Sequence, residues 1–358
     1  MTSLEIYLIK AILMTAAGNA DVLQLREIAK PELPSPHHLR VKLAAAGVNP
    51  IDTKLRANPV YHPDKLPAIL GCDGAGIVAE TGGAVTRFKP GDAVYFCNGG
   101  LGGNLGDEPG CYAEYTVLHE DYCAAKPANL SLEDSAALPL ALITAWEALV
   151  ERANLQAGQT VLIHAAAGGV GHVAVQLAHH LGANIAATVG DEKKLGLAHG
   201  LGAEKIIEYR EQDFVQETLD WTGGKGADVV FDTVGGETFL RSLNAVRVGG
   251  KLVTLLSTPL ALADTQLARL RNLSLCYELM LTPQVMNLHD ERVRQRKILE
   301  AGARLVEAGR LGVLVSHKLP LGQAALAHRM IEAGGMIGKI VLTIDDRALA
   351  APCEGCGT

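Results

Sequence analysis

The sequence predicts an α/β protein in which a doubly wound parallel sheet is inserted into a β-rich unit. Between residues 133 and 283, short apolar runs alternate with segments of helical periodicity, as in successive strand–helix–strand units. A glycine-rich stretch at 164–171 follows one of these runs and opens the next helical segment. Elsewhere, short strands punctuated by glycine and proline predominate, which is typical of a barrel-like unit. We therefore expect two domains, one inserted into the other.

Residues 1–132 are expected to form the first part of the β-rich domain. The first 35 residues alternate apolar runs with polar breaks and end at a proline-rich turn, which favours a hairpin. A strand is predicted from Leu39 to Ala46, followed by a turn into a short helix that ends near Asn58. Two further strands are predicted within LPAILGCDGAGIVAETG and FKPGDAVYF.

Residues 133–283 are expected to form the inserted domain, and residues 284–358 to return to the first one. A capping box at 131–134 begins a helix that connects the two domains. A strand near 273–279 extends the parallel sheet, and a charged helix follows it at 290–308. The remaining strand, helix and strand of the β-rich domain are predicted at VLVSHKLPL, Gln323 to Ala333 and GKIVLTID.

The glycine-rich stretch predicts a dinucleotide-binding loop. The apolar run 160–165 suits a buried parallel strand, and apolar residues recur at helical spacing from Val170 until Gly182 ends the helix. Gly168 lets the backbone approach a pyrophosphate, and Gly171 lets helix and strand pack closely. The alternative, a glycine loop that only packs, is disfavoured because strand, loop, helix and the next strand follow in the right order.

Ala166 departs from the G-x-G-x-x-G pattern, because it stands where the first glycine is expected. An alanine is tolerated there only if its φ angle stays negative. With that condition, the loop residues assigned to the cofactor are Ala166, Gly168, Gly169, Val170 and Gly171.

Length, composition and charge limit the classes of function. A chain of 358 residues, 48% of them hydrophobic, has enough core for two domains. It has no apolar run of about 20 residues and no signal-peptide pattern, so we expect a soluble cytoplasmic protein without a membrane partner. A net charge of −7 with interspersed signs argues against a nucleic-acid partner. The seven cysteines form no framework, and the terminal C-x-x-C of Cys353 and Cys356 is expected to lie in a flexible tail.

Seven segments, in order along nearly the whole chain, resemble one enzyme family. They are AAGVNPIDTKLRAN, LGCDGAGIV, FKPGDAV, HAAAGGVGHVAVQLA, ATVGDEKK, FDTVGG and GKIVL. The chain is similar to the zinc-independent quinone oxidoreductase branch of the medium-chain dehydrogenase/reductase superfamily, which includes zeta-crystallin. The resemblance implies a Rossmann domain inserted into a GroES-like barrel domain, with NADPH as the cofactor.

The comparison also indicates that both zinc sites of the superfamily's alcohol dehydrogenases are absent. Those enzymes have G-H-E where this chain has Gly71, Cys72 and Asp73, and a cysteine ligand where it has Asn49. Their lobe of four closely spaced cysteines is missing as well. A zinc alcohol dehydrogenase with altered ligands, Cys72 and Asp73, is the nearest alternative, and Asn49 counts against it.

The end of the second strand of the parallel sheet bears on the choice of nucleotide. NAD-selective folds place a carboxylate there, on the ribose 2′-hydroxyl, whereas this strand ends in Gly190. Asp191 follows and keeps NADH as an option, but Lys193 and Lys194 would attract a 2′-phosphate. In the resembling family, residues at the positions of Lys194 and Tyr209 hold this phosphate. The alternative is that the lysines only solvate a helix start.

Other cofactor contacts are expected at the carboxyl edge of the parallel sheet, where such folds bind ligands. Two strand ends supply four of these residues, namely Val234, Gly235, Leu256 and Ser257. By resemblance, Thr144 contacts the nicotinamide, although its hydroxyl could instead bond back to its own helix. Lys339 is a candidate for a second phosphate contact.

Catalysis is predicted to need little from the protein, because the cofactor carries the hydride. Asn49 is expected to donate its amide to a developing enolate or hydroquinone oxygen, and Tyr61 to give the proton, unless Tyr61 only lines the rim. His164 is expected to be structural. The predicted activity is NADPH-dependent, metal-free reduction of a small-molecule quinone or α,β-unsaturated carbonyl compound. A cofactor-binding protein with a structural or regulatory role is the rival from another class.

A homodimer is predicted from the last strand of the sheet. The apolar segment at 273–281 is long for an unprotected edge, and pairing it across a two-fold axis would join two sheets. The alternative is a monomer in which the helix at 290–308 covers this segment.

Overall fold

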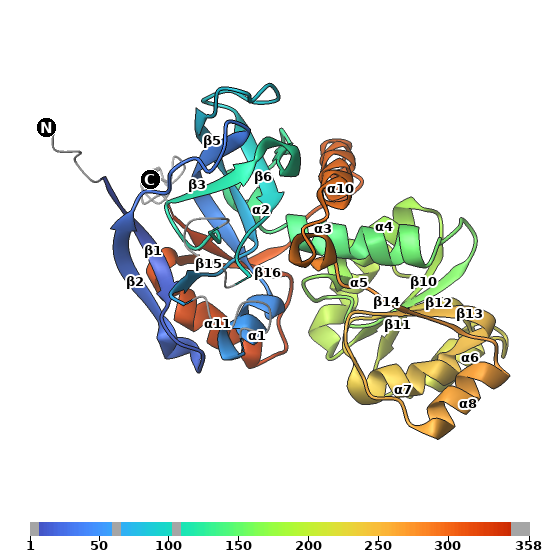
Figure 1. Cartoon of the computed structure of the whole chain (residues 1–358). Coiled ribbons are helices and arrows are strands. Elements are labelled where there is room, and N and C mark those ends of the chain that lie inside the picture. Colours follow the sequence, from blue (N-terminus) through green and yellow to red (C-terminus); the bar gives the residue numbers. More distant parts are fainter. Residues whose placement is uncertain (1–6, 59–65, 102–108, 345–358) are drawn as a thin grey trace, which may run out of the picture. The chain divides into compact units, whose positions relative to one another are not determined.

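The computed structural model describes residues 7–58, 66–101 and 109–344 (Figure 1). The chain divides into two compact units. Unit 1 comprises Met1–Pro139, His317–Gly334 and Ile340–Thr358, and unit 2 comprises Leu140–Ser316 and Gly335–Lys339. Within the described ranges, no helix is both long and apolar enough to cross a membrane.

Unit 2 is built on one six-stranded sheet. Its strands are β9 (Thr160–Ile163), β10 (Asn184–Val189), β11 (Lys205–Glu208), β12 (Ala227–Asp232), β13 (Val246–Thr254) and β14 (Ser274–Tyr277). Neighbouring strands are parallel, in the order β11-β10-β9-β12-β13-β14. The chain builds one side of the sheet outward from β9 and then returns to build the other side from β12. The ends of β9 and β12 therefore flank the crossover point at which such sheets bind ligands.

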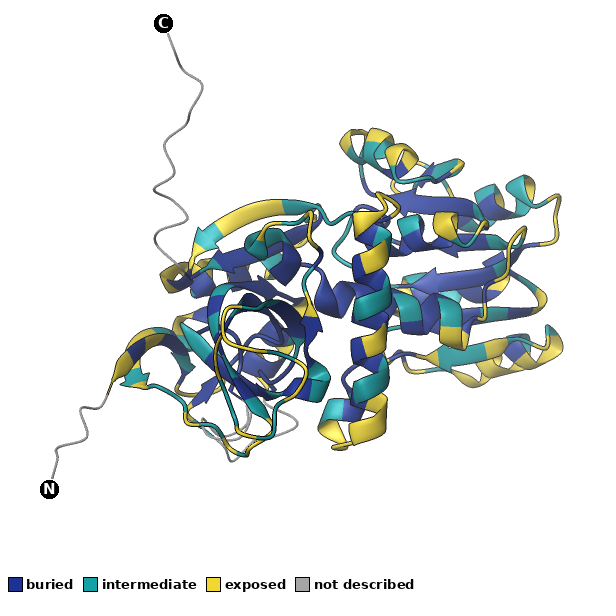
Figure 2. Cartoon of the chain, turned by 90° about the horizontal axis from the view of Figure 1, so that it is seen from above, coloured by how far each residue is buried: buried dark blue, intermediate teal, exposed yellow. Residues whose placement is uncertain are grey.

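Helices cover both faces of this sheet. Helix α4 (Gly171–His180) lies on one face, and α6 (Phe214–Trp221), α7 (Gly236–Ala245) and α8 (Leu262–Leu270) lie on the other (Figure 1). The central strands are consequently buried on both sides, as the dark blue strands of Figure 2 show, which explains why they are continuous apolar runs. The predicted doubly wound sheet is confirmed.

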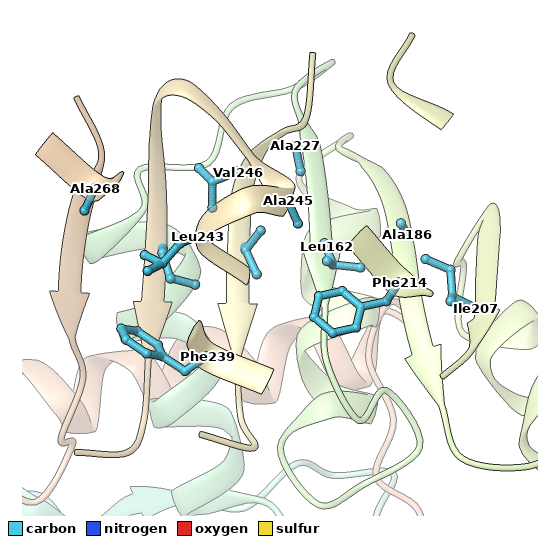
Figure 3. Packing of buried hydrophobic residues seen from close by; sticks show 12 residues of the cluster. Leu162, Ala186, Ile207, Phe214, Ala227, Phe239, Leu243, Ala245, Val246 and Ala268 are labelled. Carbon is cyan, nitrogen blue, oxygen red and sulfur yellow. The ribbon is translucent and has the colours of Figure 1, made fainter. Parts of the chain in front are cut away.

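The face under α6, α7 and α8 holds a hydrophobic cluster (Figure 3). Phe214 from α6, at 3% exposure, lies beside Leu162 and Ile207 of the strands, and Phe239 from α7, at 1% exposure, lies in another part of the cluster near Leu243. Burying a side chain of this size contributes roughly 1.5–3 kcal/mol. These contacts hold the helices against the strands whose carboxyl ends carry the candidate site.

The predicted charged helix is present as α10 (His289–Glu307), and it belongs to unit 2. It packs closely on α3 (Pro139–Trp146). At this contact Gly302 of α10 lies against Leu142 of α3, and a Cβ on Gly302 would overlap the Leu142 side chain. The chain therefore returns to unit 1 at His317, which is later than the expected boundary at 283/284. The connecting helix begins as α2 (Leu132–Ala136), which lies in unit 1. Unit 2 begins at Leu140, which is later than the expected boundary at 132/133.

Unit 1 is built on two sheets. The smaller contains β1 (Leu8–Met14), β2 (Leu23–Ala29) and β4 (Ala68–Ile69). The larger contains β3 (His38–Val48), β5 (Asp73–Thr81), β6 (Ala93–Cys97), β7 (Tyr115–His119), β8 (Ala124–Ala125), β15 (Val315–Pro320) and β16 (Lys339–Thr343). Strand β16 comes from the C-terminal part of the chain and pairs with β3. The predicted insertion of one domain into the other is therefore confirmed.

Two helices of unit 1 match the expected positions. The short helix after β3 is α1 (Pro50–Ala57), with Asn49 before it and Asn58 after it as caps. The later one is α11 (Ala324–Glu332), which contacts α1. Asn49, one of the two residues proposed for catalysis, directly precedes α1.

Candidate cofactor site and catalytic residues

The glycine-rich loop leaves β9 through a strained turn. Ala165 has a left-handed φ of 51°, a conformation that costs a non-glycine residue energy and that clusters at functional sites. Ala166 is not among the positive-φ residues, so the condition placed on it is met, and its N–H donates to the Thr188 carbonyl at 3.0 Å. The N–H of Gly168 donates to Ala165 O at 2.9 Å, which closes the turn.

Space requires glycine at one position of the loop, Gly171, and leaves little room at Gly168. A Cβ at Gly171 would overlap the carbonyl oxygen of Ala165, and one at Gly168 would lie 3.1 Å from the same atom. Val170 precedes α4 directly, and its carbonyl accepts hydrogen bonds from Val173 and Ala174 in the first turn. The loop is therefore a small backbone cradle before a helix N-terminus, which fits the pyrophosphate of a dinucleotide.

His172 joins the glycine-rich loop to Leu314, although no motif in the sequence singles it out. Its Nδ1 lies 2.8 Å from the Gly168 carbonyl, and its Nε2 accepts from the Leu314 N–H at 3.1 Å. Burial lowers the pKa of His172 to about 4, so the ring is neutral at physiological pH, with the Nδ1 proton donated to Gly168. The partner Leu314 is remote in sequence, and only the motif's neighbouring glycines could have drawn attention to His172.

Residues 335–339 form a third wall of the cradle within unit 2. The N–H of Gly338 donates to the Ala167 carbonyl at 2.8 Å. Lys339 is 4% exposed, and its Cδ lies 3.3 Å from where Gly169 would carry a Cβ. The structure therefore places the Lys339 side chain beside the glycine-rich loop.

The end of β10 gathers the residues expected at the adenosine ribose. Tyr209 is half exposed and lies over Gly190, with its hydroxyl 3.0 Å from where a Cβ would stand. The ammonium of Lys194 lies 2.9 Å from Asp191 Oδ2. The hydrogen bond to Lys194, together with the positive charge of Arg210, lowers the pKa of Asp191. Arg210 is thus a third cation at this site, and sequence reasoning missed it.

The other expected contacts lie at two strand ends. The Asp232 carboxylate accepts from the N–H groups of Val234 and Gly235 at 3.0 and 2.9 Å, which shapes the turn after β12. A Cβ on Gly235 would lie 2.8 Å from Leu256, so the turns after β12 and β13 touch. Ser257 is exposed. These residues meet at one sheet edge, as expected for parallel strands.

Two further polar residues of unit 2, Thr144 and His164, make hydrogen bonds within the unit. Thr144 is buried, and its hydroxyl donates to the Leu140 carbonyl at 2.7 Å in its own helix, so only its oxygen lone pairs are left for a ligand. His164 lies 3.1 Å from Thr188 Oγ1 and 3.0 Å from Ser242 Oγ, and burial lowers its pKa to about 4. His164 is therefore a structural residue, as expected.

In unit 1, Asn49 is buried at 1% exposure and held from two sides. Its Nδ2 donates to Asp73 Oδ2 at 2.9 Å, and its backbone N–H donates to Asp52 Oδ2 at 2.8 Å. One of the two N–H groups of the amide predicted to donate to a substrate oxygen is thus used by Asp73. Tyr61 falls outside the described residues.

A buried network behind Asn49 was not foreseen. Tyr112 donates its hydroxyl to Asp52 Oδ2 at 2.8 Å and lies 3.3 Å from His328 Nε2. Burial lowers the pKa of His328 to about 4 and raises that of Tyr112 well above its usual value. These partners lie far apart in sequence, so periodicity could not have brought them together. The network fixes the start of α1 and hence the position of Asn49.

The alternative metal ligands lie next to this network. Cys97 is the cross-strand partner of Asp73, and a hydrogen bond with Cys72, followed by burial, raises the pKa of Cys97 well above its usual value. Within the described part of the chain, no three His, Cys, Asp or Glu side chains are arranged to hold a metal ion.

Comparison with known proteins identifies the family. Residues 35–128 match the alcohol dehydrogenase GroES-like domain, and residues 201–342 match the zinc-binding dehydrogenase family. The quinone oxidoreductase of Pseudomonas aeruginosa is 33% identical over 333 residues, which cover 93% of this chain and 99% of that protein. This chain belongs to the quinone oxidoreductase branch of the medium-chain dehydrogenase/reductase superfamily.

Two further proteins resemble the chain over nearly its full length. A 2-haloacrylate reductase from Burkholderia sp is 33% identical and covers 94% of this chain and 99% of its own. The crystal structure of the Escherichia coli quinone oxidoreductase complexed with NADPH has a TM-score of 0.82 and 31% identity, covering 93% and 99% of the two chains. The protein is therefore an oxidoreductase with a GroES-like domain and an inserted Rossmann domain.

Proposed function

We propose that this medium-chain oxidoreductase uses NADPH to reduce quinones or α,β-unsaturated carbonyl compounds without a metal ion. The observation that carries the proposal is the end of β10, where glycine replaces the usual carboxylate and Lys194, Arg210 and Tyr209 gather. The NADPH complex of the Escherichia coli relative and the 2-haloacrylate reductase support the nucleotide and an activated C=C substrate, respectively.

The residues of unit 2 would hold the nucleotide. The backbone of Gly168 and Gly169 and the N-terminus of α4 would bind the pyrophosphate, with Lys339 as a second cation beside the loop. Lys194 would bind the 2′-phosphate through a charge-assisted hydrogen bond. NADPH supplies a hydride when bound, so the protein has to bind, orient and protonate. We assign unit 2 to the nucleotide and unit 1 to the substrate.

Asn49 is our candidate for stabilising the substrate oxygen. Its hydrogen bond to Asp73 and the Asp52 contact fix the amide in one orientation, which is what electrostatic stabilisation of a developing oxyanion requires. Tyr61 is the candidate proton donor. For a quinone, solvent can complete protonation, whereas an enolate carbon needs a placed acid.

Metal independence is proposed from the chemistry of these donors. Where the related alcohol dehydrogenases have a cysteine, this chain has the neutral amide of Asn49, and Asp73 already accepts a hydrogen bond from it. A hydrogen bond with Cys72 and burial raise the pKa of the Cys97 thiol well above its usual value. A zinc alcohol dehydrogenase is the alternative.

A homodimer through the edge of the sheet of unit 2 is part of the proposal. The edge strand β14 leaves Tyr277 54% exposed, and Leu279 just beyond it is 45% exposed. Apolar side chains beside an open strand edge favour pairing with a second copy. We also propose a cytoplasmic location, which suits the cysteines of the described residues because none of them is in a disulfide.

The deciding experiment is turnover. NADPH oxidation is followed at 340 nm against a panel of quinones and enones, before and after chelation. Binding of NADPH without oxidation by any member of the panel would favour the cofactor-binding protein with a structural or regulatory role.

A further inference from the structure

His172 is a buried histidine that uses both ring nitrogens on backbone groups. It stands in the first turn of α4 and is fully buried. Its Nε2 accepts from the Leu314 N–H at 3.1 Å, so in the neutral ring the proton is on Nδ1, which lies 2.8 Å from the Gly168 carbonyl oxygen. The ring therefore joins the glycine-rich loop to the segment that precedes β15.

The ring fixes the peptide between Gly168 and Gly169. A planar trans peptide points its C=O and its N–H in opposite directions. Because the Gly168 carbonyl is held on the side of His172, the Gly169 N–H points away from the ring. Within the described residues, the N–H groups of Gly169 and Val170 have no hydrogen-bond partner, and both residues are partly exposed. These two donors are therefore available to an anionic oxygen at the start of α4.

Without the imidazole, this peptide would be weakly held. Glycine stands on both sides of it, and a glycine backbone changes conformation at low cost. The Gly168 carbonyl would keep one other donor, the backbone N–H of His172 at 3.1 Å. A peptide that turned over would present its carbonyl oxygen to the anion in place of an N–H. The hydrogen bond from the ring disfavours that arrangement before any ligand binds.

The other end of the ring is attached to the segment that carries Lys339. The carbonyl of Leu314 accepts from the Lys339 N–H at 2.8 Å. Burial, and after it the positive charge of Lys339, lower the pKa of His172, which indicates that the ammonium lies near the ring. His172 thus contacts the loop directly and the candidate phosphate cation's segment through Leu314.

We propose that His172 is a positioning residue for the pyrophosphate of the nucleotide. This inference rests on the proposed nucleotide site. The Nδ1–H of His172 holds the Gly168 carbonyl, so the Gly169 N–H is directed at a phosphate oxygen. The side chain acts through the loop and not by touching the nucleotide. Its contribution is preorganisation, because a glycine-rich loop that is already fixed loses less conformational freedom on binding. The 2′-phosphate, which is assigned to Lys194, does not depend on it.

The test compares NADPH with adenosine 2′-phosphate, which has the 2′-phosphate and lacks the pyrophosphate. His172→Phe removes both hydrogen bonds of the ring and keeps a ring in the buried space, and His172→Ala is measured in parallel in case the phenylalanine variant does not fold. His172→Asn is the conservative variant, because its amide can donate from near the position of Nδ1 and has no group at the position of Nε2. Dissociation constants are measured by nucleotide fluorescence and calorimetry without any substrate, and thermal unfolding checks that the variants are folded.

Gln176→Met is the matched control. Gln176 lies one turn further along α4 and holds the same segment as His172, since it exchanges two hydrogen bonds with the backbone of Gly312 at 2.8 and 3.0 Å. Its remaining hydrogen bond is to the His172 carbonyl at 2.8 Å. The control therefore loses a tether to residues 312–314 and keeps the contact between the ring and Gly168.

We expect His172→Phe and His172→Ala to bind NADPH about three- to tenfold more weakly than wild type, as the loss of one positioning hydrogen bond predicts. Both should bind adenosine 2′-phosphate within about twofold of wild type. His172→Asn and Gln176→Met should bind NADPH within about twofold of wild type.

Three results would overturn the inference. The first is NADPH affinity within twofold of wild type when the ring is removed. The second is equal weakening of NADPH and adenosine 2′-phosphate, which would indicate a general structural role. The third is a loss in His172→Asn or Gln176→Met as large as in the variants without the ring. Each leaves the proposed function intact, because wild-type binding of NADPH is measured in the same experiment. A wild-type protein that does not bind NADPH would contradict both the inference and the proposed function.

Discussion

Replacing Glu147 by glutamine should stabilise the protein, and increasingly so at higher pH. Glu147 lies in the π-helical turn Glu147–Arg152 with its side chain 2% exposed. Its Oε1 accepts from Gln295 Nε2 at 3.0 Å, and Arg294 lies 3.3 Å away. Burial, and then the hydrogen bond and charge of Glu278, raise the pKa of Glu147 to about 9. Glu147 therefore keeps its proton at neutral pH in the folded protein.

The raised pKa sets both the sign and the size of the effect. The folded protein keeps a proton on Glu147 that the unfolded chain releases above pH 4.5, so its contribution to stability falls as pH rises from 4.5 to about 9. The upper limit is about 1.4 kcal/mol per pH unit, which gives about 3 kcal/mol at pH 7. Glutamine is neutral at every pH and can donate to Glu278, so the variant avoids this loss.

The assay is urea-induced unfolding of both proteins at half-unit steps from pH 5 to 9. The free energy of unfolding of Glu147→Gln should exceed that of wild type by an amount that grows with pH. Glu151→Gln is the control on the same turn, since Glu151 pairs with Arg294 at a more exposed position. That control should differ from wild type by about 0–1 kcal/mol without such a slope. Parallel stability curves for wild type and Glu147→Gln would refute the retained proton on Glu147.

Five further outcomes are expected. Lys194→Ala should weaken NADPH binding by about 1.5–3 kcal/mol and leave NADH nearly unchanged, and equal weakening in titrations of both would remove Lys194 from the phosphate site. Asn49→Ala should lower kcat on a quinone and on an enone, and an unchanged kcat on either would exclude Asn49 from the mechanism. Tyr61→Phe should lower kcat less than about tenfold on the quinone and more on the enone, whereas a rim role would change mainly KM and equally for both. Light scattering at micromolar concentration should give the mass of a dimer, and a single monomeric species would reject pairing through the edge near Tyr277. Elemental analysis should find well under one zinc per chain, and stoichiometric zinc would reject metal independence.

The sequence was sufficient for features that depend on neighbours along the chain. The glycine-rich loop, the start of α4 and the Gly182 end of the helix follow from local periodicity and steric rules. The sequence did not indicate which loop residue takes the left-handed conformation. The G-x-G-x-x-G pattern points to Ala166, which stands at the first glycine position, whereas the left-handed residue is Ala165. Which residue of a tight turn takes the strained conformation depends on hydrogen bonds that spacing does not encode.

Features that depend on remote partners could not be predicted. The charge pattern of α10 indicated a helix, but its packing on α3 depends on Gly302 meeting Leu142. The hydrogen bond between Asn49 and Asp73 joins residues that are 24 positions apart in the sequence. The hydrogen bond between His172 and Leu314 joins residues that are 142 positions apart. Such pairings are set by tertiary packing, which periodicity does not specify.

The most direct test of the central claim is NADPH oxidation by the purified protein in the presence of a quinone and of an enone, with NADH in parallel and with each reaction repeated after chelation. We predict that NADPH is oxidised with at least one substrate class, more efficiently than NADH, and at the same rate after the chelator. Loss of the rate on chelation, or NADPH binding without oxidation by any substrate, would contradict the account.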